Sequence, residues 1–258
     1  MKTLIIILVT FFAGMGAGLG TGFAGMSAAA VISPMLITFL DMDSYLAVGI
    51  ALASDVLASA ISAYTYGKNK NLDIRNGLIM MVSVLCFTLV GSYVASTVPK
   101  TTMGNFSVFM TFLLGIKFIV KPVVAPKARL QNATAKQKAI RSVICGSMVG
   151  FICGFIGAGG GMMMLLVLTT VLGYELKTAV GTSVFIMAAT ALTGSVSHFA
   201  IGGAPDPVAL VTCIISTLVF ALIAALIANK VSAKTLNRAT GVVLVVLGAA
   251  IIIVNRIK

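Results

Sequence analysis

Ten apolar segments, each separated from the next by a short polar or glycine-rich stretch, occupy most of this 258-residue chain. A helix needs about 20 apolar residues to cross the hydrocarbon core of a membrane. Charged residues make up only 9% of the sequence, whereas an average soluble domain has about a quarter. The chain cannot cover itself with polar surface, so we predict an all-α integral membrane protein.

The positions of the basic residues predict the orientation of such a protein in its membrane. The net charge is +12, which in a soluble protein would favour nucleic acid as a partner. Here the lysines and arginines lie between apolar segments, where the positive-inside rule accounts for them. We therefore expect a multi-pass protein of a bacterial-type cytoplasmic (inner) membrane, with the lipid bilayer and not nucleic acid around it.

The two halves of the chain are related by an offset of 132 residues. This shift places Gly14, Gly18, Gly22, Phe23 and Gly25 on Gly146, Gly150, Gly154, Phe155 and Gly157. Internal duplication is typical of transporter folds. We predict a first transmembrane repeat at 1–121, a basic cytoplasmic linker at 122–139 and a second transmembrane repeat at 140–258. Residues 1–20 resemble a signal peptide, but they belong to the repeat, so we expect them to be retained.

Each half is predicted to hold a short helix pair, joined at a glycine-rich break, and then three ordinary spans. The predicted segments are 4–21, 25–40, 45–66, 77–97 and 104–121, then 140–157, 160–173, 177–199, 207–228 and 238–255. An odd number of passes per half would turn the second half upside down. We therefore predict two inverted repeats with 8–10 transmembrane segments, and the basic residues favour ten passes over eight.

The two breaks read GTGFAGMS from Gly20 and GFIGAGGGM from Gly154. Backbone in a membrane is costly unless its polar groups are satisfied, and free N–H groups at a helix start attract anions. Equivalent breaks in two repeats indicate a midplane transport site, although close helix packing is the alternative. The predicted substrate-binding residues at the breaks are Gly22, Gly25, Ser27, Gly159, Gly160 and Gly161.

Four further side chains are candidates. The hydroxyls of Thr182 and Ser183 can donate to carboxylate or sulfonate oxygens, or bond back to their own helix. Asp55 is the only carboxylate deep in a predicted span, and His198 is the only histidine. Ionisable groups in spans are functional candidates, so we expect Asp55 and His198 to bind a coupling proton or cation. The alternatives are a hydroxyl-capped Asp55 and a solvated His198.

No catalytic constellation, Walker loop or zinc-type spacing occurs in the sequence. A membrane-embedded enzyme would need polar groups that converge at one depth, and too few are present. We therefore expect a protein that is not an enzyme and that needs no cofactor and no metal.

The second break, followed by Ala179-Val180-Gly181-Thr182-Ser183, resembles the TauE/SafE family, also called sulfite exporter or toluenesulfonate-uptake permeases. The resemblance covers the whole chain and is weaker in the first half, where Ala28 and Ala29 replace the glycines at 160 and 161. It implies a secondary carrier, without nucleotide hydrolysis, for sulfite, sulfonates such as sulfoacetate, or related anions.

The leading hypothesis is thus a secondary transporter, and more specifically an exporter, of a small sulfur-containing anion. Coupling to a proton or a cation and a homodimeric state are left open. The alternatives are a carrier of a small carboxylate, a cation-coupled channel, and a membrane-embedded subunit without transport activity of its own.

Overall fold

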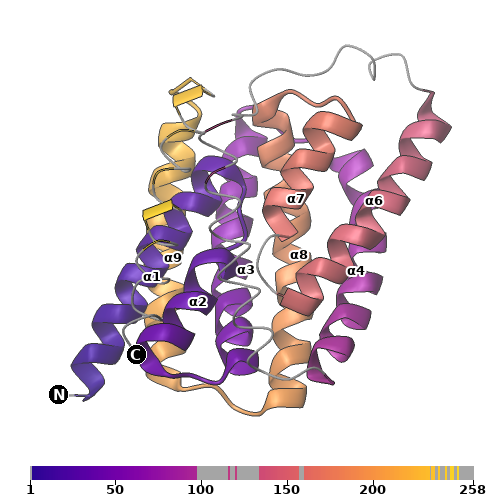
Figure 1. The fold of residues 1–258 in the computed structure, drawn as a ribbon. Helices are drawn as coiled ribbons and strands as arrows, with labels where there is room; N and C mark the ends of the chain where they lie inside the picture. The colour runs from indigo at the N-terminus through magenta and orange to yellow at the C-terminus, as the bar shows by residue number, and fades with distance from the viewer. Residues whose placement is uncertain are drawn as a thin grey trace.

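The computed structural model describes residues 2–97, 134–156 and 160–232, together with isolated positions between 116 and 120 and between 234 and 249. Every regular element in the three ranges is helical (Figure 1). The elements are α1 (Lys2–Ala24), α2 (Ala29–Leu40), α3 (Ser44–Lys68), α4 (Ile74–Ser96), α6 (Ala135–Ile156), α7 (Gly160–Leu166), the π-helical turn η2 (Val167–Val171), α8 (Leu176–Gly202) and α9 (Pro207–Ala228). The predicted segments 104–121 and 238–255 lie outside the described residues, apart from those isolated positions.

Five of these helices, namely α1, α3, α4, α8 and α9, are long and apolar enough to cross a membrane. The apolar helix α2 and the apolar part of α6, Ala139–Phe155, are shorter. The prediction of an all-α membrane protein is confirmed. The short helix of each predicted pair is also present, because α2 follows the first glycine break and α7 with η2 follows the second.

The distribution of side chains is the one that a lipid solvent demands. Large apolar side chains point outward from the helices, whereas many serines and threonines are buried. The outward-facing residues include Phe12, Val82, Ile144, Val196 and Ile215, and the buried polar residues include Ser54, Ser59, Ser62, Thr182 and Ser183. Because lipid offers no hydrogen bonds, polar groups are placed where other protein groups can meet them.

Three helices begin at an aspartate in the preceding loop. The carboxylate of Asp43 accepts hydrogen bonds from the Tyr45 and Leu46 amides at the start of α3. Asp73 accepts from the Asn76 amide at the start of α4, and Asp206 accepts from the Ala209 amide at the start of α9. Such caps satisfy amides that have no partner within the helix and favour a negative charge there.

The tightest packing joins helices of opposite halves. α1 packs along α9, α6 packs along α4, and α3 packs along α8. The offset of 132 relates α1 to α6, and an offset of about the same size relates α4 to α9, so the first two pairings are equivalent. Both rest on glycines spaced four apart, which are Gly14, Gly18 and Gly22 in α1 and Gly146, Gly150 and Gly154 in α6.

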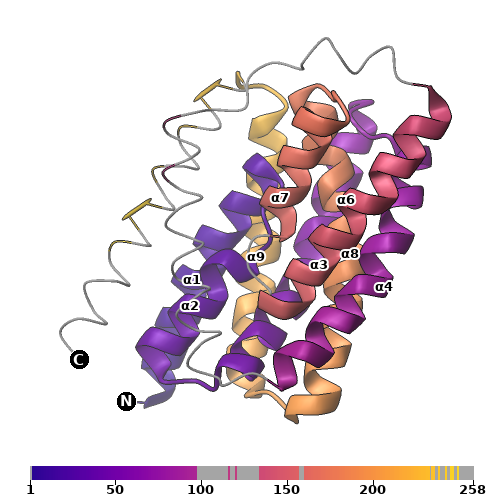
Figure 2. The ribbon, with the colours of Figure 1, turned by 45° about the vertical axis from the view of Figure 1, so that its right-hand side comes forward.

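Figures 1 and 2 also show that α1 and α6 run in opposite directions: α1 rises from the N-terminus, whereas α6 descends from the side where α1 ends. An inverted repeat predicts this arrangement. The fifth segment of each half lies outside the described residues, so the complete inverted repeat and its boundaries stay predictions. The linker predicted at 122–139 overlaps α6, which begins at Ala135.

Candidate functional site

The first break is a short non-helical turn inside the bundle. α1 ends at Ala24, and Gly25 adopts a left-handed backbone conformation with a φ of 62°. Glycine reaches this conformation without the steric penalty that other residues incur. The Gly25 amide still donates to the Thr21 carbonyl oxygen at 2.9 Å. The chain then turns through Met26 and Ser27, both buried, and enters α2 at Ala29.

The second break lies directly against the first. α6 ends at Ile156 and α7 begins at Gly160, while Gly159 lies outside the described residues. A Cβ atom at Gly161 would lie 2.5 Å from the Ser27 amide nitrogen and 2.6 Å from the Gly25 carbonyl oxygen. A Cβ atom at Gly160 would lie 2.9 Å from the Cys153 side chain. The backbones of the two breaks thus touch at positions where no side chain fits.

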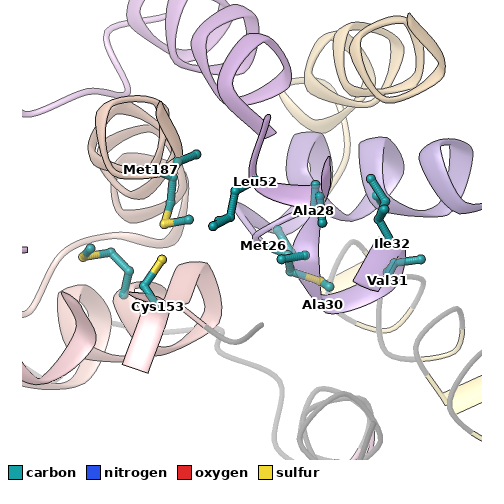
Figure 3. Packing of buried hydrophobic residues seen from close by; sticks show 14 of the residues in the cluster. Met26, Ala28, Ala30, Val31, Ile32, Leu52, Cys153 and Met187 are labelled. Carbon is teal, nitrogen blue, oxygen red and sulfur yellow. The ribbon is translucent and has the colours of Figure 1, made fainter. Parts of the chain in front are cut away.

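The cluster formed by Gly25–Ser27, Asp55, Gly161 and Ser183 is called the junction below. The Ser183 hydroxyl donates to the Val180 carbonyl oxygen at 2.9 Å and lies 3.4 Å from the Gly25 carbonyl oxygen. Figure 3 shows the side chain of Met26 within the junction and the apolar side chains of Leu52, Cys153 and Met187 near it. The structure therefore brings together five of the predicted site positions from both halves.

Asp55 is fully buried in the middle of α3 and holds the start of α2. Its Oδ2 atom accepts the Ala28 amide at 3.0 Å, and its Oδ1 atom accepts the Ser59 hydroxyl at 2.7 Å. The Ser27 side chain also hydrogen-bonds this carboxylate. The positive end of the α2 dipole therefore faces an anion that belongs to the protein itself.

Two predicted site residues lie elsewhere. Gly22 is inside α1, and a Cβ atom there would lie 2.6 Å from the Cβ atom of Ala224 in α9. Its carbonyl oxygen accepts the Tyr66 hydroxyl at 3.0 Å. The Thr182 hydroxyl accepts the Asp73 amide at 3.1 Å, so it faces the loop between α3 and α4. Gly22 thus serves helix packing, and Thr182 serves a loop.

That loop holds a polar cluster outside the spans. The Asp73 carboxylate accepts the Tyr174 hydroxyl and the Asn76 side-chain amide, both at 2.7 Å. Burial acts to raise the pKa of Asp73, but these hydrogen bonds outweigh it and the pKa is lowered. Burial and the neighbouring Asp73 carboxylate raise the pKa of Tyr174. The cluster keeps Asp73 ionised where it caps α4.

His198 is buried near the other end of α8, and it is not solvated. Its ring stacks on Tyr45 with centroids 4.3 Å apart, and its Nδ1 atom lies 2.9 Å from the Gly194 carbonyl oxygen. That geometry assigns the proton to Nδ1, because a carbonyl oxygen can only accept. Nε2 has no hydrogen-bond partner among the described residues. The offset of 132 matches His198 with Tyr66.

The residues predicted from the sequence did not include Ser59, Ser62 and Tyr66. Together with Asp55 they form one buried stripe along α3, at spacings of four, three and four residues. Residues three and four apart lie on the same face of a helix. That spacing is visible in the sequence and could have extended the site from Asp55 to these three side chains.

An apolar groove of about 770 Å³ opens between α3, α4 and α8, away from the junction. Its lining includes Ala63, Tyr64, Met81 and Phe185. At one end the Lys68 ammonium lies 4.7 Å from the centre of the Tyr64 ring. The lining offers few hydrogen-bond donors, so this groove is a poor match for a small anion.

A helical bundle with membrane-spanning helices and two interior breaks in contact is the architecture of a multi-pass membrane transporter. The comparisons with known proteins agree. The model of the family described as sulfite exporter TauE/SafE matches residues 10–251, so the chain belongs to the TauE/SafE family.

Two relatives from Bacillus subtilis (strain 168) match over nearly the whole chain. The probable membrane transporter protein YunE is 25% identical over 268 residues, which cover 98% of each protein. The probable membrane transporter protein YdhB is 24% identical over 236 residues, which cover 92% of this chain and 94% of that protein. A probable membrane transporter protein from Methanocaldococcus jannaschii is 24% identical over 81% of this chain.

Proposed function

We propose that this protein is a secondary transporter of a small sulfur-containing anion, such as sulfite or a sulfonate like sulfoacetate, and not an enzyme. It would work as an exporter in a cytoplasmic (inner) membrane. The observation that carries this proposal is the contact between the two breaks, where Gly161 lies against the Gly25–Ser27 backbone inside the bundle. Family membership supports the class of substrate.

The junction has the chemistry that a sulfonate or sulfite group needs. Such a group presents several oxygens that accept hydrogen bonds, and backbone amides and hydroxyls are the matching donors. We propose that the substrate is bound by Gly25, Ser27, Gly159, Gly160, Gly161 and Ser183. Glycines let the backbone approach a ligand closely. Gly22 and Thr182 would support this site through packing and the adjoining loop.

A cation is a weaker fit at this junction. A cation site needs oxygen atoms that point at a common centre. Here the Asp55 carboxylate is already engaged by three donors, which are the Ala28 amide and the Ser59 and Ser27 side chains. Donors that converge on an anion indicate a site adapted to negative charge. The basic residues of the predicted cytoplasmic loops favour export, because they would concentrate anions on that side.

Efflux from proteoliposomes tests the proposal. Vesicles that contain the purified full chain are loaded with sulfite or sulfoacetate, and efflux is followed against protein-free vesicles. We expect efflux of at least one of these anions. Ser183→Ala should slow it about five- to tenfold, the worth of one hydrogen bond. The control is Ser147→Ala, because the Ser147 hydroxyl also donates within its own helix, to Val143, but lies outside the junction.

Two results would count against the proposal. Correctly inserted protein that moves neither anion would not be a carrier on its own, and recovery with a second membrane protein would identify a subunit. If a small carboxylate such as acetate moved and neither sulfite nor sulfoacetate did, the protein would still be a carrier, but its substrate class would be different.

A further inference from the structure

At the start of α2, a carboxylate of the protein itself occupies hydrogen-bond donors that a substrate anion could use. The Asp55 carboxylate takes the Ala28 amide at 3.0 Å and the Ser59 hydroxyl at 2.7 Å. A carboxylate and a sulfonate both offer oxygen acceptors with a delocalised negative charge. The donors that would receive a substrate anion at the first break are therefore already occupied by an anion of the protein.

This carboxylate has few charged neighbours. Among the described residues, α2, α7 and α9 carry no lysine, arginine, histidine, aspartate or glutamate, and α1 carries only Lys2. α6 carries Lys136, Lys138 and Arg141 in its first two turns. Further along, it contributes the buried Cys153 thiol, which interacts electrostatically with Asp55. α4 has Arg75 at its start, and α8 has Lys177, which donates to the Asn229 carbonyl oxygen, and His198 at the other end.

No cation from these helices contacts Asp55. Its charged form is therefore stabilised by hydrogen bonds and by the α2 dipole. A second anion at the same donors would face this charge in a medium that screens it poorly, and the repulsion would be large. Protonation of Asp55 removes the repulsion and frees the Ala28 amide. One further turn along α3, the buried Ser62 hydroxyl has no partner within the described part of the chain.

We propose that Asp55 is a proton-operated substitute for the transported anion. The anion takes the place of the carboxylate at the Ala28 amide, and Asp55 at the same time takes up one proton from water on a carboxylate oxygen. When the anion leaves, Asp55 releases the proton and accepts the amide again. One negative charge and one proton are bound together, so loading is electroneutral. This inference rests on the proposed function, because it needs an anionic substrate.

The second half cannot duplicate this device. The offset of 132 matches Ser27, Asp55 and Ser59 with Gly159, Met187 and Ala191. Glycine has no side chain, and the side chains of methionine and alanine can neither bear a charge nor donate a hydrogen bond. The two halves together therefore offer one proton site of this kind, which predicts one proton for each anion.

Calorimetric titration of the purified full chain with methanesulfonate tests the inference. This probe stays ionised between pH 5 and pH 8, so any proton taken up binds to the protein. Titrations in two buffers of different ionisation enthalpy count the protons. We expect up to one proton for each anion bound, and an apparent affinity that rises up to about tenfold for each pH unit lowered.

Three variants sharpen the result. Asp55→Asn should bind methanesulfonate without proton uptake and with an affinity independent of pH. Ser59→Ala removes a donor to the charged carboxylate, so Asp55 takes up its proton at higher pH and the affinity profile shifts upward in pH. Ser54→Ala is the matched control, because the Ser54 hydroxyl donates to the Ile50 carbonyl oxygen and does not bond Asp55.

The outcomes separate the two proposals. Wild-type protein that binds methanesulfonate without proton uptake, or Asp55→Asn that keeps the wild-type pH dependence, overturns this inference and leaves the anion carrier intact. Folded wild-type protein that binds no sulfonate and no sulfite overturns the proposed function and this inference with it. If Asp55→Asn fails to fold, the shift expected of Ser59→Ala, compared with Ser54→Ala, decides the question.

Discussion

The two glycine breaks occupy matching positions of the sequence repeat and differ in the residues that the repeat pairs around them. At the first break, Ser27, Asp55 and Ser59 form a buried hydrogen-bonded group that holds the start of α2. The offset of 132 places Gly159, Met187 and Ala191 at the second. The three positions thus include an ionisable side chain in the first half and none in the second half. Positions that match in a repeat can therefore differ in chemistry, with an ionisable group in only one of them.

The largest effect is expected when the uncharged copy is given a charge. Met187→Asp would bury a carboxylate where the first-half hydroxyl donors are replaced by glycine and alanine, and should cost about 3–5 kcal/mol of stability at pH 8. The loss should shrink as the pH falls, because protonation removes the buried charge. Met187→Leu, close in volume, should cost less than about 1.5 kcal/mol.

Thermal unfolding can be followed with a thiol-reactive dye, since the chain has no tryptophan and Cys153 and Cys213 are buried in the folded state. Met187→Asp with wild-type stability at pH 8 would show that the second break also offers donors to a carboxylate. The contrast between the two breaks would then be wrong.

The next largest loss of stability is expected where the two breaks touch. Gly161→Ala places a methyl group 2.5 Å from the Ser27 amide nitrogen, and such overpacking should cost about 3 kcal/mol. The same change at Gly67 is the control, because the nearest atom there is 3.4 Å away at the end of the Leu72 side chain. Gly67→Ala should be neutral or stabilise by less than about 1 kcal/mol. Equal melting temperatures for the two variants would mean that the breaks do not touch.

A smaller effect is expected where Tyr66 supports the end of α1. Tyr66→Phe removes the hydrogen bond to the Gly22 carbonyl oxygen and should cost about 1 kcal/mol. The matched change is Tyr64→Phe, one helical face away, where the side chain is 59% exposed. Stability is measured by the same dye assay, and a loss confined to Tyr64→Phe would contradict the role given to Tyr66.

The smallest effect is expected at the loop cluster. Tyr174→Phe removes a donor from the Asp73 carboxylate, so the pKa of Asp73 rises toward its ordinary value. A lowered folded-state pKa gives stability that is present above the ordinary range and lost in acid. The variant should therefore lose well under 1 kcal/mol at neutral pH and show a weaker decline as the solution is acidified. An unchanged acid profile would argue against the Tyr174–Asp73 hydrogen bond.

The periodic glycines show how far the sequence could be interpreted. The matches at Gly14, Gly18 and Gly22 led to the predicted repeat, and in the structure these residues form a helix seam and not the break itself. Small residues serve both close packing and ligand approach, and spacing alone does not separate the two uses. The turn begins three residues later, at Gly25, where the backbone conformation requires glycine.

The polar candidates show a second limit. The burial of Asp55 and the positions of the helices follow from apolar runs and loops in the sequence. The partner of each hydroxyl does not, because it depends on which helices become neighbours. Thr182 and Ser183 are adjacent in α8, yet one faces Asp73 and the other faces Gly25. The 4–3–4 spacing from Asp55 to Tyr66 was visible in the sequence. Only the structure shows that Tyr66, at the end of this stripe, contacts α1.

The packing of helices from one half on helices of the other also limits the order in which the helices can pair during synthesis. The glycine surface of α1 fits α9, which begins at Pro207, whereas α4 and α6 are nearer in sequence and can pair earlier. During synthesis, α1 can contact α2 and α3 early, but it cannot pack on α9 until most of the described helices have been made. A fragment that stops before Pro207 would retain the α4–α6 pair and leave α1 without its partner. The first of the described helices thus completes its packing only with the last of them.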